Sequence, residues 1–166
     1  FYAELLLALQ RFDESLAYVE KSRQLNPLNY SVPIVVWIYQ MQRRDDLALT
    51  ELDRIVNSEP DNRYFHISAE RIFTRMGDAQ KAFKEWVWLM RDSGISEERI
   101  TIAQARFDQQ GLKGFNRWLL DEKIEADLGD YSPPLSWARY ALVAGDYERA
   151  LDLLDAAYAK RQYPLL

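Results

Sequence analysis

The chain has 166 residues, of which 48% are hydrophobic, 13% aromatic and 28% charged, with a formal net charge of −5. This composition is typical of a folded globular protein and excludes a disordered chain, and the acidic balance gives no overall attraction to nucleic acid or to an anionic membrane. The absence of cysteine and the single histidine, His66, exclude disulfides, thiolate catalysis and the usual cysteine or multi-histidine metal sites, so we expect no cofactor.

Apolar residues recur with helical spacing along most of the chain, and no alternating strand pattern appears. We therefore predict an all-α fold made of helical hairpins. In chain order, the predicted hairpins span residues 1–28, 29–62, 63–96, 97–130 and 131–164. The longest uncharged stretch, residues 24–42, is interrupted by prolines and polar residues, so its apolar part is too short to span a bilayer.

A repeat of about 34 residues underlies these hairpins. Gly77, Gly111 and Gly145 lie 34 residues apart, and steps of 34 and then 33 residues back from Gly77 lead to Arg43 and Gln10. We predict that each of these marker residues lies in the turn between two antiparallel helices. Glycine suits such a turn because it adopts a positive φ without a steric penalty from a Cβ atom.

Two further positions of the repeat predict how the helices pack. The residue five positions after each marker is expected to be buried where the second helix of a hairpin approaches the first. These residues are Ser15, Ala48, Ala82, Asn116 and Ala150. Apolar residues four positions further on, and four and eight positions before the marker, predict a stripe that each hairpin buries against the next, with Tyr2 and Leu154 among its outermost members.

Three stretches at these turns resemble the tetratricopeptide repeat: residues 11–16 with 25–27, residues 76–83, and residues 144–151. The resemblance implies a right-handed α-solenoid of about five hairpins, with residues 1–166 forming a single domain. The hairpin at 97–130 departs most from the family pattern, because Asn116 and Lys123 occupy sites that are normally small. Both ends of the chain lack a capping segment, which predicts a fragment of a longer protein.

A second resemblance concerns residues 114–118 and 132–139. These are similar to the C-terminal tetratricopeptide region of bacterial ToxR/CadC-type winged-helix transcriptional regulators. The resemblance implies a regulatory or sensory domain of a bacterial transcriptional regulator or signalling protein. It also implies a periplasmic location if the membrane-anchored type applies, and a cytoplasmic one otherwise.

The tetratricopeptide resemblance implies a concave groove that binds a protein or peptide partner. The groove positions predicted as the binding site are Tyr30, Trp37, Met41, Tyr64, Arg71, Arg75 and Arg139. Aromatic residues and arginines dominate binding hot spots, and two arginines one helical turn apart suit a carboxylate of a peptide. The alternative is that the aromatic rings only cover the neighbouring helix, while the two arginines pair with Glu70, Asp78 or acids of the fourth hairpin.

The sequence thus predicts a non-catalytic binding scaffold, with a homodimer as a further assembly because apolar faces at the ends of a solenoid would be exposed. One alternative is a sensor that binds an anionic small molecule near Arg71, Arg75 and Arg139. Another is an enzyme that uses the acids of the fourth hairpin, which are Asp121, Glu122, Glu125 and Asp127. The enzyme is disfavoured, because these acids are distributed around one helix as on a solvated face.

Overall fold

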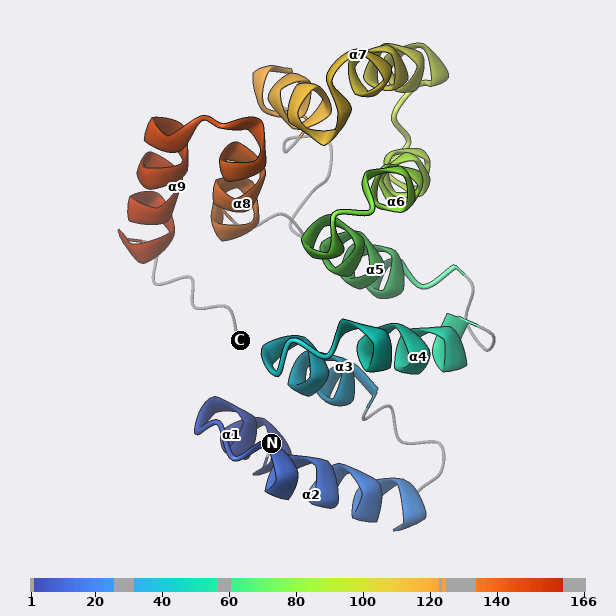
Figure 1. Cartoon of the computed structure of the whole chain (residues 1–166), viewed down its shortest axis with the longest axis vertical. Coiled ribbons are helices and arrows are strands. Elements are labelled where there is room, and N and C mark those ends of the chain that lie inside the picture. Colours follow the sequence, from blue (N-terminus) through green and yellow to red (C-terminus); the bar gives the residue numbers. More distant parts are fainter. Residues whose placement is uncertain (1, 26–31, 57–60, 123, 125–133, 160–166) are drawn as a thin grey trace. The chain divides into compact units, whose positions relative to one another are not determined.

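The computed structural model describes residues 2–25, 32–56, 61–122, 124 and 134–159 (Figure 1). Over these ranges the chain contains nine helices and no strand, which confirms the all-α prediction. The residues form two compact units, one over residues 1–78 and one over residues 79–165. The arrangement of the hairpins as one solenoid stays a prediction.

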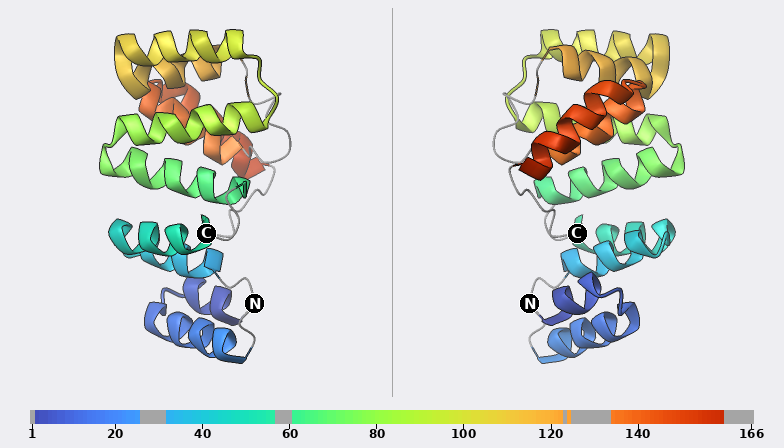
Figure 2. Two further views of the ribbon diagram at one scale, coloured as in Figure 1. Left: turned by 90° about the vertical axis from the view of Figure 1, so that its right-hand side faces the viewer. Right: turned by 90° about the vertical axis from the view of Figure 1, so that its left-hand side faces the viewer.

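The described residues of the first unit form five helices. They are α1 (Tyr2–Ala8), α2 (Phe12–Leu25), α3 (Val32–Met41), α4 (Asp45–Val56) and α5 (Arg63–Met76). Helix α1 packs on α2 and α3 on α4, and the turns of these two pairs lie on the same side of the unit (Figures 1 and 2). The pairs are connected, because α3 also contacts α2 and α5 contacts α4. A hydrophobic core shared by α3, α4 and α5 is built from Val36, Ala48, Leu52, Phe65 and Ile72.

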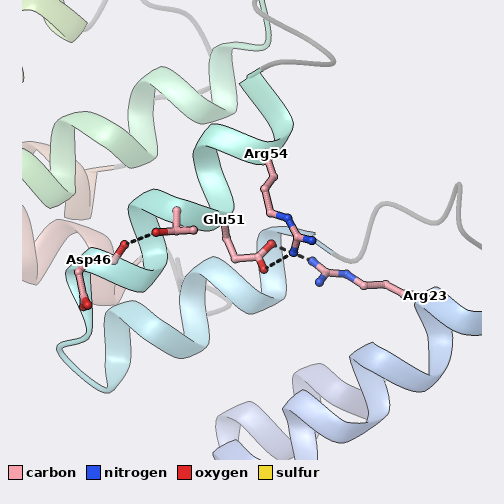
Figure 3. A network of polar contacts seen from close by, with 5 residues as sticks. Arg23, Asp46, Glu51 and Arg54 are labelled. Carbon is pink, nitrogen blue, oxygen red and sulfur yellow. Dashed lines mark hydrogen bonds and ion pairs between the residues drawn. The ribbon is translucent and has the colours of Figure 1, made fainter.

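An ion network also links α2 to α4 in the first unit (Figure 3). The Glu51 carboxylate lies between two guanidinium groups, with Arg23 of α2 and Arg54 of α4 each 3.1 Å from one of its oxygens. Only 12% of the Glu51 side chain is exposed, so water screens this contact less than it does an ordinary surface pair. The network therefore stabilises the register of one hairpin against the next.

The second unit contains α6 (Ala79–Asp92), α7 (Glu97–Asp121), α8 (Pro134–Ala144) and α9 (Tyr147–Ala159). Its core is a chain of aromatic rings. Phe83 of α6 stacks on Phe107 of α7 with ring centroids 4.2 Å apart, and Phe115 meets Phe83 edge-on at 5.0 Å. This series of rings continues with Trp86 of α6 and Tyr140 of α8. The ring centroids of these two residues are 5.1 Å apart. Because such pairs add to the hydrophobic effect, they fix α6, α7 and α8 against one another.

The predicted turn positions are confirmed at all five markers. Their φ angles are positive, at 57° for Gln10, 59° for Arg43, 79° for Gly77, 61° for Gly111 and 76° for Gly145. At four of them the next residue donates its N–H to a carbonyl five residues back, as Arg44 does to Tyr39 at 2.9 Å. This bond is characteristic of a helix that ends at a left-handed residue, and it satisfies a carbonyl that the helix leaves unpaired.

The fifth marker, Gly111, makes a different turn. It lies within α7 with φ 61° and ψ −151°, whereas the ψ of Gly77 is 9°. Helix α7 changes direction at this point (Figure 1). Three residues later, a Cβ atom on Gly114 would lie 2.6 Å from Cβ of Gln110 and 2.8 Å from the carbonyl oxygen of Arg106. The two halves of α7 are therefore closer here than any side chain at position 114 allows.

The residue five positions after each marker is buried, as predicted. The exposed fractions are 0% for Ser15, Ala48 and Ala82, 2% for Asn116 and 1% for Ala150. The prediction of a continuous buried stripe is wrong at its two ends, because 51% of Tyr2 and 38% of Leu154 are exposed. A stripe position is buried only where another hairpin packs on it, and the described residues leave these two side chains partly uncovered.

We expect Gly111→Asn to be more destabilising than Gly77→Asn. The backbone angles of Gly111 lie where only glycine is comfortable, and a side chain there costs about 1–3 kcal/mol. Asparagine tolerates the ordinary left-handed conformation of Gly77, so that substitution should cost about 1 kcal/mol. Urea unfolding followed by circular dichroism measures both costs, and equal costs would contradict the special geometry of the α7 turn.

Candidate functional site

Five of the seven predicted site residues lie in the first unit. They are Trp37 and Met41 on α3, and Tyr64, Arg71 and Arg75 on α5. Arg139 lies on α8 in the second unit, and Tyr30 lies outside the described residues. The structure brings Trp37 of α3 and Tyr64 of α5 together, while a grouping of Arg71 and Arg75 with Arg139 stays a prediction.

The aromatic part of the site is formed by Trp37 and Tyr64. Their ring centroids are 6.3 Å apart with planes inclined at 71°, which is a favourable edge-to-face geometry. Tyr64 also meets Phe65 edge-on at 5.7 Å, and Phe65 is a core residue with 4% exposure. Both site rings are half-buried, so they form a firm platform of which part faces solvent.

The start of α5 fixes the position of Tyr64. The Asn62 side chain caps this helix by accepting a hydrogen bond of 3.0 Å from the backbone N–H of Tyr64. Such a cap satisfies one of the donors that the first turn of a helix leaves free. The ring at position 64 is therefore set by both the cap and the packing on Phe65.

Both burial and the nearby Arg71 affect the pKa of the Tyr64 hydroxyl. Burial raises the pKa of Tyr64 above its ordinary value of 10.0, because it disfavours the phenolate. The Ser68 hydroxyl and the positive charge of Arg71 act in the opposite direction, with a smaller effect. Tyr64 is thus a neutral phenol at physiological pH, with the Arg71 guanidinium near enough to affect it.

Arg75 is engaged by Asp45 at the start of α4. Its Nε donates to Oδ2 of Asp45 at 3.0 Å, and its Nη2 contacts Oδ1 of the same carboxylate. The two side chains are only 29% and 16% exposed, respectively. Asp45 is a partner that the sequence did not indicate. Any anionic ligand of Arg75 would have to replace both contacts of this fork-shaped pair.

The other two candidate partners of the arginines lie on or beside α5. Glu70 is buried, with 2% exposure, and accepts a hydrogen bond of 2.8 Å from the Thr74 hydroxyl. Asp78 follows the left-handed turn at Gly77, and its N–H donates to the Phe73 carbonyl at 2.9 Å. The carboxylate of Glu70 is thus buried and hydrogen-bonded within α5, and it does not face solvent.

In the second unit, Arg139 lies over the ring of Tyr140, with its guanidinium carbon 4.5 Å from the ring centroid. This is a cation–π distance, and Tyr140 itself is a core residue with 6% exposure. Arg139 therefore helps to cover the aromatic core of its own unit, which the sequence alone did not reveal.

Two of the four acids of the fourth hairpin, Asp121 and Glu122, lie in the described part of the chain. Arg149 of α9 donates to the Asp121 carboxylate at 3.2 Å and to the Leu120 carbonyl at 2.5 Å, so Asp121 serves to fasten α9 to the end of α7. Glu122 is exposed, and Glu125 and Asp127 lie outside the described residues. Within the described ranges, no three His, Asp or Glu side chains gather in a way that could hold a metal ion.

Comparison with known proteins does not place the chain in a family. No protein-family model matches it, and a search of curated proteins finds no significant match. Among the helices described above, none has the length and apolar character required to cross a membrane.

We expect Tyr64→Phe to change how stability depends on pH above 10. Because the pKa of Tyr64 is raised in the folded chain, the unfolded chain loses this proton first as the pH rises past 10.0, and the free energy of unfolding falls. The phenylalanine variant cannot lose this proton and should show a shallower fall, with no such difference below pH 9 or so.

The matched control is Tyr158→Phe, because 81% of Tyr158 is exposed. Urea unfolding of the three proteins from neutral pH to about pH 11 provides the measurement. An equal decline for wild type and Tyr64→Phe would show that the hydroxyl of Tyr64 is not the buried group inferred here.

Proposed function

We propose that this chain is a non-catalytic scaffold that binds a protein or peptide partner, built as a right-handed α-solenoid of the tetratricopeptide type. The recurring local geometry supports this proposal. Each marker residue, spaced by 33 or 34 positions, has a positive φ, and each is followed after five residues by a fully buried one. Repeated hairpins of this kind stack by their faces and leave a surface for a partner.

The observation that carries the proposed function is the edge-to-face pair of Trp37 and Tyr64 with Arg71 beside it. The half-buried rings offer rigid apolar contact area at a low entropic cost, and the positive charge of Arg71 favours a carboxylate beside them. Met41, of which 36% is exposed, extends the apolar surface along α3. The preferred partner is accordingly a peptide with an apolar or aromatic anchor and a nearby carboxylate.

In this proposal the scaffold is the regulatory or sensory domain of a larger bacterial transcriptional regulator or signalling protein. Support for this part comes from the sequence resemblance described above. The alternative of a sensor for a small anionic molecule has less support, since Arg75 is already paired with Asp45 and Arg139 lies on the ring of Tyr140.

The binding surface can be tested without knowing the natural partner. Panning a random-peptide library against the whole chain provides probe peptides, and fluorescence anisotropy measures their affinity. We expect Trp37→Ala and Arg71→Ala each to weaken binding of the selected peptides by about tenfold or more, as for residues at the centre of an interface. The selected sequences should be enriched in Asp, Glu or a free C-terminal carboxylate.

The matched control is Arg54→Ala, because Arg54 is on α4 of the same unit and its side chain is 69% exposed. This variant should bind the probes with the wild-type affinity. If the selected peptides bind all three variants equally, the α3–α5 surface is not the binding site.

We further expect Asp45→Asn to strengthen binding of the acidic probes. The substitution removes the carboxylate that occupies Arg75, so the guanidinium becomes available to the ligand, and a gain of about three- to tenfold is reasonable for one charge-assisted contact. Adding Arg75→Ala to Asp45→Asn should abolish the gain. An Asp45→Asn variant that binds more weakly than wild type would place the ligand away from Arg75.

A further inference from the structure

An exposed apolar stripe runs along α9 in the second unit. Its members and their exposed fractions are Tyr147 at 68%, Leu151 at 62%, Leu154 at 38% and Tyr158 at 81%. Successive members are four, three and four residues apart, so with 3.6 residues per turn they share one face of the helix. Two tyrosines thus frame two leucines in a continuous row, and large exposed apolar rows mark sites of interaction.

The two sides of this row differ in charge and in burial. On one side the helical register places Ala150 and Ala157, which are buried, with 1% and 3% exposure. On the other side it places Glu148, Asp152 and Asp155, all of which are exposed. The row therefore lies between the core of its unit and a line of three carboxylates.

We propose that this face of α9 docks an amphipathic helix of a partner protein whose apolar ridge is flanked by Lys or Arg. Apolar residues spaced by three and four positions are the pattern that receives a helix in this way. The carboxylates beside the row select the partner, since basic side chains next to its apolar ridge would lie against them. This surface belongs to the second unit and does not rest on the α3–α5 site.

A second copy of the chain is a poorer occupant than a basic helix. When two identical helices pack antiparallel through one apolar row, the flanks of the same kind face each other. For α9 this would set Glu148, Asp152 and Asp155 of one copy beside the same residues of the other, in a chain whose net charge is already −5. Like charges in such positions are destabilising.

A designed peptide serves as the probe. It is a fluorescein-labelled helix of about five turns made only of Leu and Lys, with leucines alternately three and four residues apart. One comparison peptide replaces each Lys by Glu, and another has the same composition in an order that breaks the helical row. With the whole chain as the binder, we expect only the ordered Leu/Lys peptide to bind, with an affinity that falls as salt is added.

Variants then locate the peptide on α9. The pair Leu151→Ser with Leu154→Ser should weaken binding by about tenfold or more, and the pair Asp152→Lys with Asp155→Lys should weaken it and flatten its dependence on salt. The control is Ile102→Ser, since 42% of Ile102 is exposed on α7 of the same unit. Circular dichroism of each variant verifies that its helices are intact, which is expected because all the substituted positions are exposed.

Two results would overturn the proposal. One is binding that is unchanged by the leucine pair, or equal for the Leu/Glu peptide, because the row or its acidic flank would then play no part. The other is a wild-type dimer in sedimentation that the leucine pair converts to monomer, because a second copy would then occupy the row. If the α9 variants still bind the acidic peptides at α3–α5, a failure of the α9 proposal leaves the proposed function of the α3–α5 site unaffected.

Discussion

Close approach of two helices after a left-handed turn is the constraint on which both units depend. The position five residues after each turn is buried, so its side chain must be small or must pair its polar atoms within the contact. Ser15 does so by donating its hydroxyl to the Ala3 carbonyl at 2.7 Å, which ties α2 to α1. Asn116 does so only in part, because its amide donates to the Leu112 carbonyl at 2.7 Å while its Oδ1 is buried without a hydrogen-bond partner. In α7 the tightest contact lies instead at Gly114, where a Cβ atom would meet the preceding turn. The larger residue at 116 is thus accompanied by the smallest one two positions earlier.

Local chemistry explains why the turns and the small buried residues could be predicted from the sequence. A positive φ and the carbonyl bond that goes with it depend on a few neighbouring residues, and even Gln10 and Arg43 adopt it where glycine would be preferred. The burial of the apolar stripe needs more information, because it depends on contacts between hairpins that neighbouring residues in the sequence do not specify, and Leu154 is partly exposed although it holds a stripe position. The partner of Arg75 could not be predicted from the sequence either. Asp45 is 30 residues away along the chain and contacts Arg75 only because α4 packs on α5.

The pair of Arg75 and Asp45 alters what the proposed binding surface can select. A free arginine attracts any anion, whereas one held by both oxygens of a carboxylate yields only to a ligand that offers an equally good pair of acceptors in the right place. Part of the gain from a new contact is offset by the loss of the old one, so the pair favours specificity over affinity. The charge of Arg71 acts on the half-buried Tyr64, next to the ring of Trp37. The aromatic platform and Arg71 would therefore set the affinity, and Arg75 the choice among acidic ligands.

The two proposed surfaces have opposite chemistry although they belong to one acidic chain. In the first unit, rings and guanidinium groups favour a ligand with a carboxylate, whereas α9 presents leucines and tyrosines beside Glu148, Asp152 and Asp155. A net charge of −5 would by itself predict attraction to basic partners only. Exposed charges act mainly within about 10 Å at ordinary ionic strength, so each surface is governed by its own neighbours and not by the total. The two proposed surfaces would therefore select partners of opposite charge, each through the residues of its own unit.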